Sequence, residues 1–214
     1  MKFYVALAIG FAPLILSACM TSPSAKEGAI QFEGSGSSAI PVNSTATFVA
    51  GDIAHSRYGV RALMYLEKNR DRYGIVDARN ELAFLREDID TLGQKHVRFQ
   101  QVQSGVPVWG HQLIVHFDQR DQAMRVTGSF LPGLGRIDVR PRISAEAAAV
   151  TAVSVKGTGW RATDNTLYIY SLASRPHLAW HVTLKRGLDR WFIFVNANDG
   201  AVLHQITGAP TAEQ

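Results

Sequence analysis

Residues 96–118 read HVRFQQVQSGVPVWGHQLIVHFD and contain two alternating strand patterns joined by a turn. Successive side chains of a strand point to opposite faces, so Val97 and Phe99 share an apolar face with polar residues opposite. The alternation recurs over residues 113–117. The two patterns therefore predict a half-buried antiparallel ribbon.

The link between the patterns has its own signals. Ser104 and Gly105 supply a flexible turn. Pro107 has no backbone N–H to donate to a ladder, so we expect Val106–Trp109 to lie at a sheet edge or in the connection.

The ribbon resembles the fungalysin/thermolysin propeptide module of thermolysin-like metalloproteases. The hallmark of that module is a His-Val-Arg-Phe-Gln-Gln strand, followed by Gly-Val-Pro-Val and a Gln-Leu-Ile-Val-His strand, and all three occur in residues 96–116. The resemblance extends upstream through residues 62–66 and 81–82 and downstream through residues 125–130. It covers about residues 57–132.

The chain that follows resembles a PepSY domain, the usual second half of such propeptides. The similarity rests on Ser144–Ala147 at the start of a helix and on the strand segments 178–182 and 191–200. Asn196 stands where that pattern usually has Asp, so a carboxylate role at this position is not carried over.

Helix and strand patterns support an α+β fold. An amphipathic helix is expected over residues 53–73, with Asp52 as N-cap, Gly74 as the stop and an apolar face made by Val60, Leu63, Met64 and Leu66. A second helix is expected over residues 145–155, with Ser144 as its cap. Strands are expected at residues 80–89, 96–102, 113–117, 123–130, 167–171, 177–184, 190–195 and 201–206.

These elements form two small modules, each a helix packed on an antiparallel sheet. The resemblance implies a cystatin-like arrangement. We place the propeptide-like module at residues 48–134, the PepSY-like module at residues 135–207 and a C-terminal tail at residues 208–214.

The first residues predict export and lipid anchoring. Residues 1–18 resemble a secretory signal peptide, with Lys2 before a short apolar run. Residues 16–19, Leu-Ser-Ala-Cys, match a bacterial lipobox, which predicts cleavage between Ala18 and Cys19 and lipidation of Cys19. The alternative is an incidental thiol in a signal peptide cleaved elsewhere. Residues 19–47 are rich in Ser, Gly, Ala and Thr and are expected to form a flexible linker.

The expected location is the bacterial cell envelope. Two lipid chains suffice for stable membrane attachment. Met20 is not the Asp that is associated with inner-membrane retention of lipoproteins, so the outer membrane is favoured in a Gram-negative host.

Catalytic and metal-binding classes find little support. The zinc proteases of the resembled family carry His-Glu-x-x-His, and this chain contains no His-Glu dipeptide. His177 and His181 have helical zinc spacing but lie in a strand pattern, which places them about 13 Å apart, too far for one zinc ion. The net charge of +4 is mild, and basic residues do not form the stripe typical of nucleic-acid binders. We therefore expect no enzyme activity, no cofactor, no metal and no nucleic-acid partner.

The resemblance implies a role as a free-standing propeptide. In the resembled proteases the module assists folding of the catalytic domain and blocks its cleft. A tethered copy is predicted to bind a thermolysin-like metalloprotease and to inhibit it or help it fold. The candidate partner-binding residues are His96, Arg98, Gln100, Trp109 and His116. Two alternatives stay open: an envelope peptide- or protein-binding module without a protease partner, and a truncated protease pro-region.

Overall fold

The two alternating patterns form the central hairpin of the first sheet. A computed structural model describes residues 45–46, 48–135 and 137–208. Within it, β3 (Lys95–Gln103) pairs antiparallel with β4 (Val106–Phe117). Ser104 and Gly105 make the turn, with φ values of 49° and 81°. Val97, Phe99 and Val115 are fully buried, as the alternation predicts.

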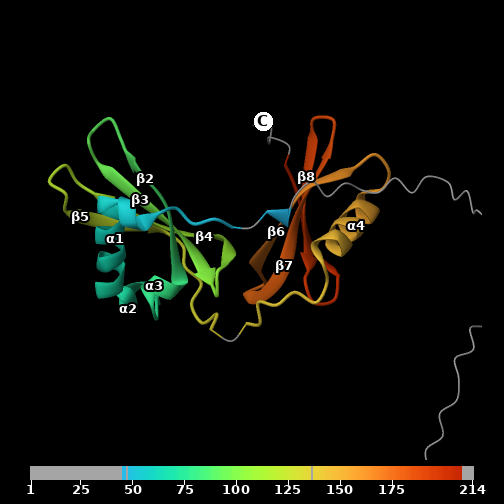
Figure 1. Cartoon of the computed structure of the whole chain (residues 1–214), viewed down its shortest axis with the longest axis horizontal. Helices are drawn as coiled ribbons and strands as arrows, with labels where there is room; N and C mark the ends of the chain where they lie inside the picture. Colours follow the sequence, from blue (N-terminus) through green and yellow to red (C-terminus); the bar gives the residue numbers. More distant parts are fainter. Residues whose placement is uncertain (1–44, 47, 136, 209–214) are drawn as a thin grey trace, which may run out of the picture. The chain divides into compact units, whose positions relative to one another are not determined.

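The strands of the described residues join in one nine-stranded sheet with the order β2-β3-β4-β6-β7-β8-β9, in which β5 also pairs with β4 and β1 with β6 (Figure 1). The remaining strands are β1 (Thr45–Ala46), β2 (Leu82–Ile89), β5 (Ala123–Gly128), β6 (Arg161–Leu172), β7 (Arg175–Arg186), β8 (Asp189–Asn196) and β9 (Val202–Thr207). With helices packed on a largely antiparallel sheet, the predicted α+β class is confirmed.

The first hydrophobic core lies between strands β2–β5 and helix α1 (Arg57–Lys68). Ala62 and Leu66 of the helix are fully buried against Phe84, Phe99 and the other apolar side chains of these strands. Burial of a large side chain such as Leu66 or Phe99 contributes about 1.5–3 kcal/mol, and alanine contributes less. The apolar stripe therefore fastens the helix to one face of the sheet.

The predicted helix over residues 53–73 is interrupted. It consists of the 3-10 helix η1 (Ile53–His55), α1 and the short α2 (Arg70–Tyr73), and a further short helix, α3 (Ala78–Glu81), precedes β2. Ser56 breaks the first turn because it is extended and its hydroxyl accepts the Gly59 N–H at 2.7 Å. Asp52 caps η1, and Gly74 ends α2 in the left-handed conformation, as expected.

The predicted apolar face of this helix is partly wrong. Met64 is 62% exposed and Val60 is 42% exposed, whereas Gly59 and Ala62, which the predicted face did not include, are buried. Gly59, Ala62 and Leu66 are the buried residues of α1, and Val60 and Met64 lie outside this buried stripe. The apolar pattern therefore predicted a buried face on this helix but assigned some of the wrong residues to it.

The expectation for Val106–Trp109 is also wrong. The segment belongs to β4, and Val108 pairs in parallel with Ile169 of β6. On its other side, Pro107 lies opposite Val102 of β3. The segment is thus an interior strand that joins the two parts of the sheet, although Pro107 has no N–H to donate.

The second core lies between β6–β9 and α4 (Ala145–Lys156). Ser144 caps this helix as predicted, and its hydroxyl accepts the Ala147 N–H at 3.2 Å. The helix buries only alanines, namely Ala145, Ala148, Ala149 and Ala152. Because alanine is small, the helix backbone approaches the sheet closely, and larger strand residues such as Trp180 and Ile193 fill the core.

The described residues all belong to one compact unit. It contains two hydrophobic cores, yet the module boundaries at residues 134–135 and 207–208 stay predictions. The predicted signal peptide, Ala18, Cys19 and nearly all of the linker lie outside the described residues.

Candidate protein-binding surface

The face of β2–β5 opposite α1 carries polar side chains in cross-strand rows, and we call it the open face. Its members are Arg86, Asp88, His96, Arg98, Gln100, Gln112, Ile114, His116, Arg125 and Thr127. One row contains Asp88, His96, His116 and Arg125, and the next contains Arg86, Arg98, Ile114 and Thr127. Four of the five predicted site residues therefore lie together on this face.

A chain of hydrogen bonds crosses the open face through two histidines. The Nδ1 atoms of His96 and His116 are 2.8 Å apart, and the rings meet edge to face at 4.9 Å. His96 Nε2 lies 3.1 Å from Asp90 Oδ2, and His116 Nε2 lies 2.7 Å from Thr127 Oγ1. Two nitrogens in such contact need one donor and one acceptor, so at least one of the two rings is neutral.

Burial and nearby cations hold His116 in the neutral form. Its side chain is buried, which lowers the pKa, and Arg125, His96 and Arg98 lower it further by repelling a second positive charge. The pKa of Asp90 is also lowered, first by the backbone N–H of Gln94 and then by the contact with His96.

Gln100 is structural as well as central to the face. It is only 6% exposed, and its Nε2 donates to the carbonyls of Val108 at 2.7 Å and His111 at 2.9 Å. Gln112 Nε2 in turn donates to Gln100 Oε1 at 3.1 Å. The open face thus carries two hydrogen-bonded networks, one through Arg98, Gln112 and Gln100 and one through the two histidines, rather than a row of separate solvated side chains.

Trp109, the fifth predicted residue, lies elsewhere. Its ring stacks on His181 at 4.5 Å and meets Tyr168 and Phe194 edge to face, each at 5.1 Å. These partners lie on the face of β6–β8 opposite α4, where they form an aromatic cluster with Phe192 and Tyr170. Trp109 therefore packs the start of β4 onto the second part of the sheet.

His181 lies at the centre of this cluster, whereas sequence reasoning considered it only as a metal ligand. It is 6% exposed, and its Nε2 has no hydrogen-bond partner among the described residues. Burial lowers its pKa to about 4, against a slight rise caused by Asp164. His177 and His181 both lie in β7, as the alternation predicts. The sequence did contain a signal for a buried histidine, because His181 lies between Trp180 and Val182 in an apolar strand.

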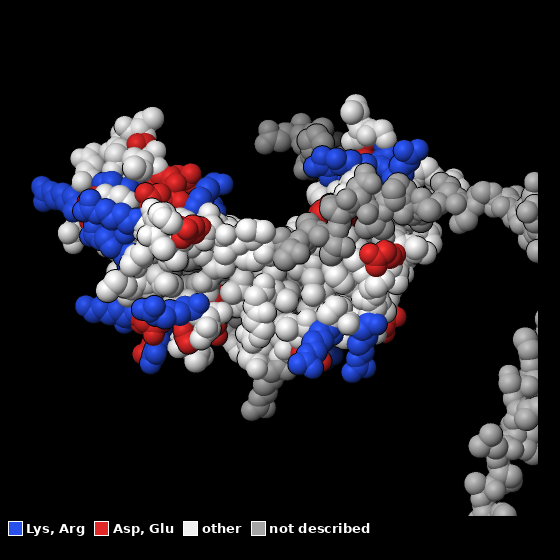
Figure 2. Space-filling view, viewed as in Figure 1, with Lys and Arg blue, Asp and Glu red and all other residues white. Residues whose placement is uncertain are grey.

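Sequence reasoning did not single out Asp121. In the β4–β5 turn it accepts from Tyr58 at 2.8 Å and from Lys95 at 2.6 Å, and Arg57 and Arg61 lie within 3.8 Å. The hydrogen bonds from Lys95 and Tyr58 lower its pKa. In Figure 2 one group of Lys and Arg side chains lies over α1, and others lie at the right of the view. Asp121 supplies a single carboxylate to three cations, Arg57, Arg61 and Lys95.

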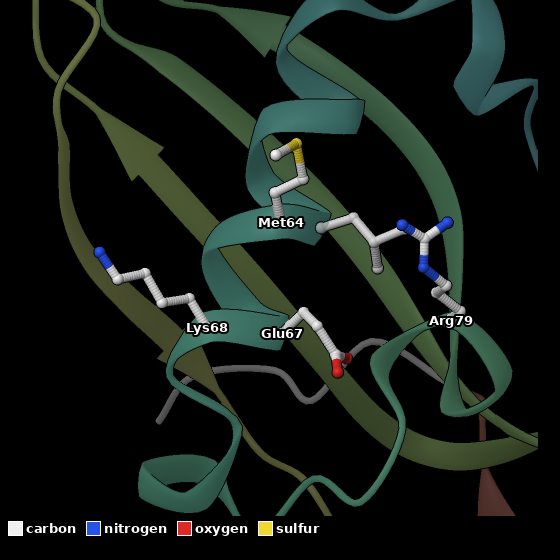
Figure 3. A pocket seen from close by; sticks show the side chains of 5 residues that line it. Met64, Glu67, Lys68 and Arg79 are labelled. Carbon is white, nitrogen blue, oxygen red and sulfur yellow. The ribbon is translucent and has the colours of Figure 1, made fainter.

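A small hollow of about 280 Å³ lies beside α1 and is lined by Leu63, Met64, Glu67, Lys68 and Arg79 (Figure 3). The carboxylate of Glu67 already has partners within the fold, because its Oε2 accepts the Ala78 N–H at 2.9 Å and its Oε1 lies 3.3 Å from Arg70. The hollow therefore offers mainly apolar surface and no organised set of polar groups.

The described part of the chain shows no group of three or more His, Cys, Asp or Glu side chains arranged to hold a metal ion. Nor does it contain a helix with the length and hydropathy needed to cross a bilayer.

Comparison with known proteins bears on the open face directly. Residues 80–130 match the family described as Fungalysin/Thermolysin Propeptide Motif. The match spans β2, β3, β4 and β5, the four strands that build the open face. The predicted resemblance of this region is confirmed.

Curated relatives point the same way. The chain is 30% identical over 158 residues to bacillolysin of Brevibacillus brevis, covering 66% of this chain and 30% of the relative. It is 28% identical over 184 residues to the thermostable neutral protease NprT of Geobacillus stearothermophilus, covering 75% and 32%. The chain thus spans about a third of the length of these relatives.

Among solved structures, the Bacillus megaterium YpeB C-terminal domain aligns with a TM-score of 0.40 and 16% identity, covering 69% of this chain and 62% of that domain. A likeness of this size does not identify a fold. The PepSY-like assignment of residues 135–207 stays a prediction.

Proposed function

We propose that this protein is a lipid-anchored free-standing propeptide that binds a thermolysin-like zinc metalloprotease in the cell envelope and inhibits it or assists its folding. The observation that carries the proposal is the coincidence between the propeptide match at residues 80–130 and strands β2–β5. These strands hold the rigid hairpin, the first core and the open face together. In this proposal the protein has no catalytic activity of its own.

The mechanism is complementarity between two folded surfaces. A sheet backed by α1 presents side chains at fixed spacing, and the hydrogen bonds of Gln100 and the two histidines hold those side chains in place before a partner arrives. Such preorganisation reduces the entropy lost on binding. The same rigid surface serves either to occlude a cleft or to template a folding intermediate.

Anchoring through Cys19 is the second part of the proposal. A tether raises the local concentration of the protein near partners in the envelope without adding any contact. Cys19→Ala is expected to move the protein from the membrane fraction to the soluble fraction, as followed by fractionation and by labelling with a radioactive fatty acid. Unchanged membrane association and no labelling of the parent protein would remove the anchor from the proposal.

The function is tested with the full chain, purified in detergent, and a thermolysin-like protease from the same organism. We expect slower hydrolysis of a short peptide substrate, greater recovery of active protease after dilution from denaturant, or both. The protein denatured by heat serves as the control for nonspecific protection. If neither rate nor recovery changes across micromolar concentrations, the proposal fails. Digestion of casein by the purified protein alone would contradict the non-catalytic part.

A further inference from the structure

Two arginines of the open face, Arg98 and Arg125, lie on the two strands that flank β4, in the row of His116 and in the row beside it. Arg125 of β5 lies directly opposite His116 in the register, and His96 lies opposite it on β3. Arg98 lies two residues along β3 from His96, in the adjoining row beside Ile114. Both guanidinium groups also lower the pKa of His116 by repelling a positive charge on its ring, after the larger effect of burial.

The other charges of this region have partners. Arg86 Nε lies 2.8 Å from Asp88 Oδ2, and His96 Nε2 lies 3.1 Å from Asp90 Oδ2. Across the described residues, neither Arg98 nor Arg125 has an ion pair with a carboxylate.

The polar contacts of Arg98 are also incomplete. Its Nη1 donates to Gln112 Oε1 at 3.2 Å, while its Nε is buried and contacts no acceptor in the described chain. Arg98 also lies directly opposite Arg86, and like charges in that position repel. Among the described residues, no carboxylate therefore pairs with either of these two guanidinium groups.

We propose that Arg98 and Arg125 bind a carboxylate of an acidic segment in the partner protein. A guanidinium group presents a planar fork that matches both oxygens of a carboxylate. The neighbouring Gln112, Thr127 and the partly exposed Ile114 provide polar and apolar contacts for the adjoining residues of that segment.

A protein segment fits this face better than a lipid surface does. Membrane-binding faces combine basic residues with bulky apolar side chains that insert among the lipids. Ile114 is the apolar member of the open face, and hydrogen-bonded amides and imidazoles surround it. Fixed polar groups of this kind favour a ligand with its own directional acceptors.

This inference rests on the proposed function in taking the protease as the partner, so its test has two arms. In the first, binding of the purified full chain to the protease is measured for the parent protein and for the double variant Arg98→Gln/Arg125→Gln. The control is Arg120→Gln/Arg175→Gln, which removes the same charge at two exposed positions that are not members of the open face. We expect roughly a tenfold or greater loss of affinity in the first variant and less than about a twofold change in the control.

The second arm uses a fluorescein-labelled peptide of alternating Glu and Ser as the probe, with anisotropy as the measurement. If the parent protein binds the peptide in a salt-sensitive way and the Arg98→Gln/Arg125→Gln variant loses that binding, the carboxylate site is supported. If the protease does not bind in the same experiments, only the proposed function fails. Binding of protease and peptide that is unchanged in this variant overturns the inference. The inference is also overturned if the parent protein binds no peptide but binds phosphatidylglycerol vesicles or inorganic phosphate, and the variant loses that binding. Circular dichroism checks that each variant is folded.

Discussion

The two parts of the sheet carry a helix on one face and differ in what they place on the other. The open face of β2–β5 is a polar layer built from histidines, glutamines and arginines. The corresponding face of β6–β8 is an aromatic cluster in which Trp109, His181 and Phe194 lie in ring contact. One strand, β4, contributes to both.

The difference separates a surface available for recognition from one already used in packing. Aromatic rings that contact one another have made their favourable contacts within the chain, and the ring of Trp109 contributes to the join between the two parts. By contrast, the guanidinium groups of Arg98 and Arg125 on the open face have no ion pair with a carboxylate among the described residues. If this comparison is right, substitutions in the aromatic cluster change mainly stability, and substitutions of the open-face arginines change mainly binding.

The largest effect on stability is expected for Trp109→Ala. The substitution removes the ring that stacks on His181 and contacts Tyr168 and Phe194, and it leaves a void between β4 and the second part of the sheet. We expect a loss of about 3 kcal/mol in the free energy of unfolding, measured by urea denaturation. A loss below about 1 kcal/mol would mean that the cluster does not join the two parts.

The second effect is a pH dependence caused by His181. Its folded-state pKa of about 4 lies below the ordinary value of 6.5, so the unfolded chain binds the proton more tightly between these values. The stabilisation is therefore complete above about pH 6.5 and is lost as the pH falls towards 4, by about 3 kcal/mol in total.

His181→Phe keeps an aromatic ring and should remove most of this slope, whereas His204→Gln at an exposed position of β9 should retain it. The measurement is the urea midpoint from pH 7 to pH 4. Equal slopes in the parent protein and His181→Phe would show that His181 is not the group that titrates.

Sequence reasoning predicted the local elements well where a single period dominated. The β3–β4 hairpin and the cap of α4 at Ser144 follow from alternation and side-chain chemistry within a few residues. The helix predicted over residues 53–73 was harder, because the Ser56 hydroxyl accepts the Gly59 N–H and separates η1 from α1.

The long-range arrangement could not be predicted in the same way. Nothing near Val108 signals its pairing with Ile169, 61 positions later, because that choice depends on how two separate cores come together. The same holds for the candidate site: alternation placed Arg98 and Gln100 on one face, but the destination of Trp109 depended on β6–β8.

A smaller effect is expected for Gln100→Leu, which keeps the volume of the buried side chain but removes its amide. The carbonyls of Val108 and His111 then lose a donor within the polar layer. We expect a loss of about 2 kcal/mol on unfolding. Gln100→Glu, which keeps the shape but replaces the donor with an acceptor, should cost at least as much. If both variants match the parent protein, the polar layer does not support the fold.

The smallest effect on stability, and the sharpest test of the comparison, is expected for Arg125→Gln. This exposed side chain has no ion pair among the described residues, so the free energy of unfolding should change by less than about 0.5 kcal/mol. The pKa of His116 should rise, because burial lowers it most and repulsion from Arg125 lowers it next. Titration of the His116 ring by NMR measures this directly, with Arg175→Gln as the control. A stable variant with a raised His116 pKa and weaker binding of an acidic ligand would place the function of Arg125 in recognition, whereas a loss of 2 kcal/mol would place it in folding.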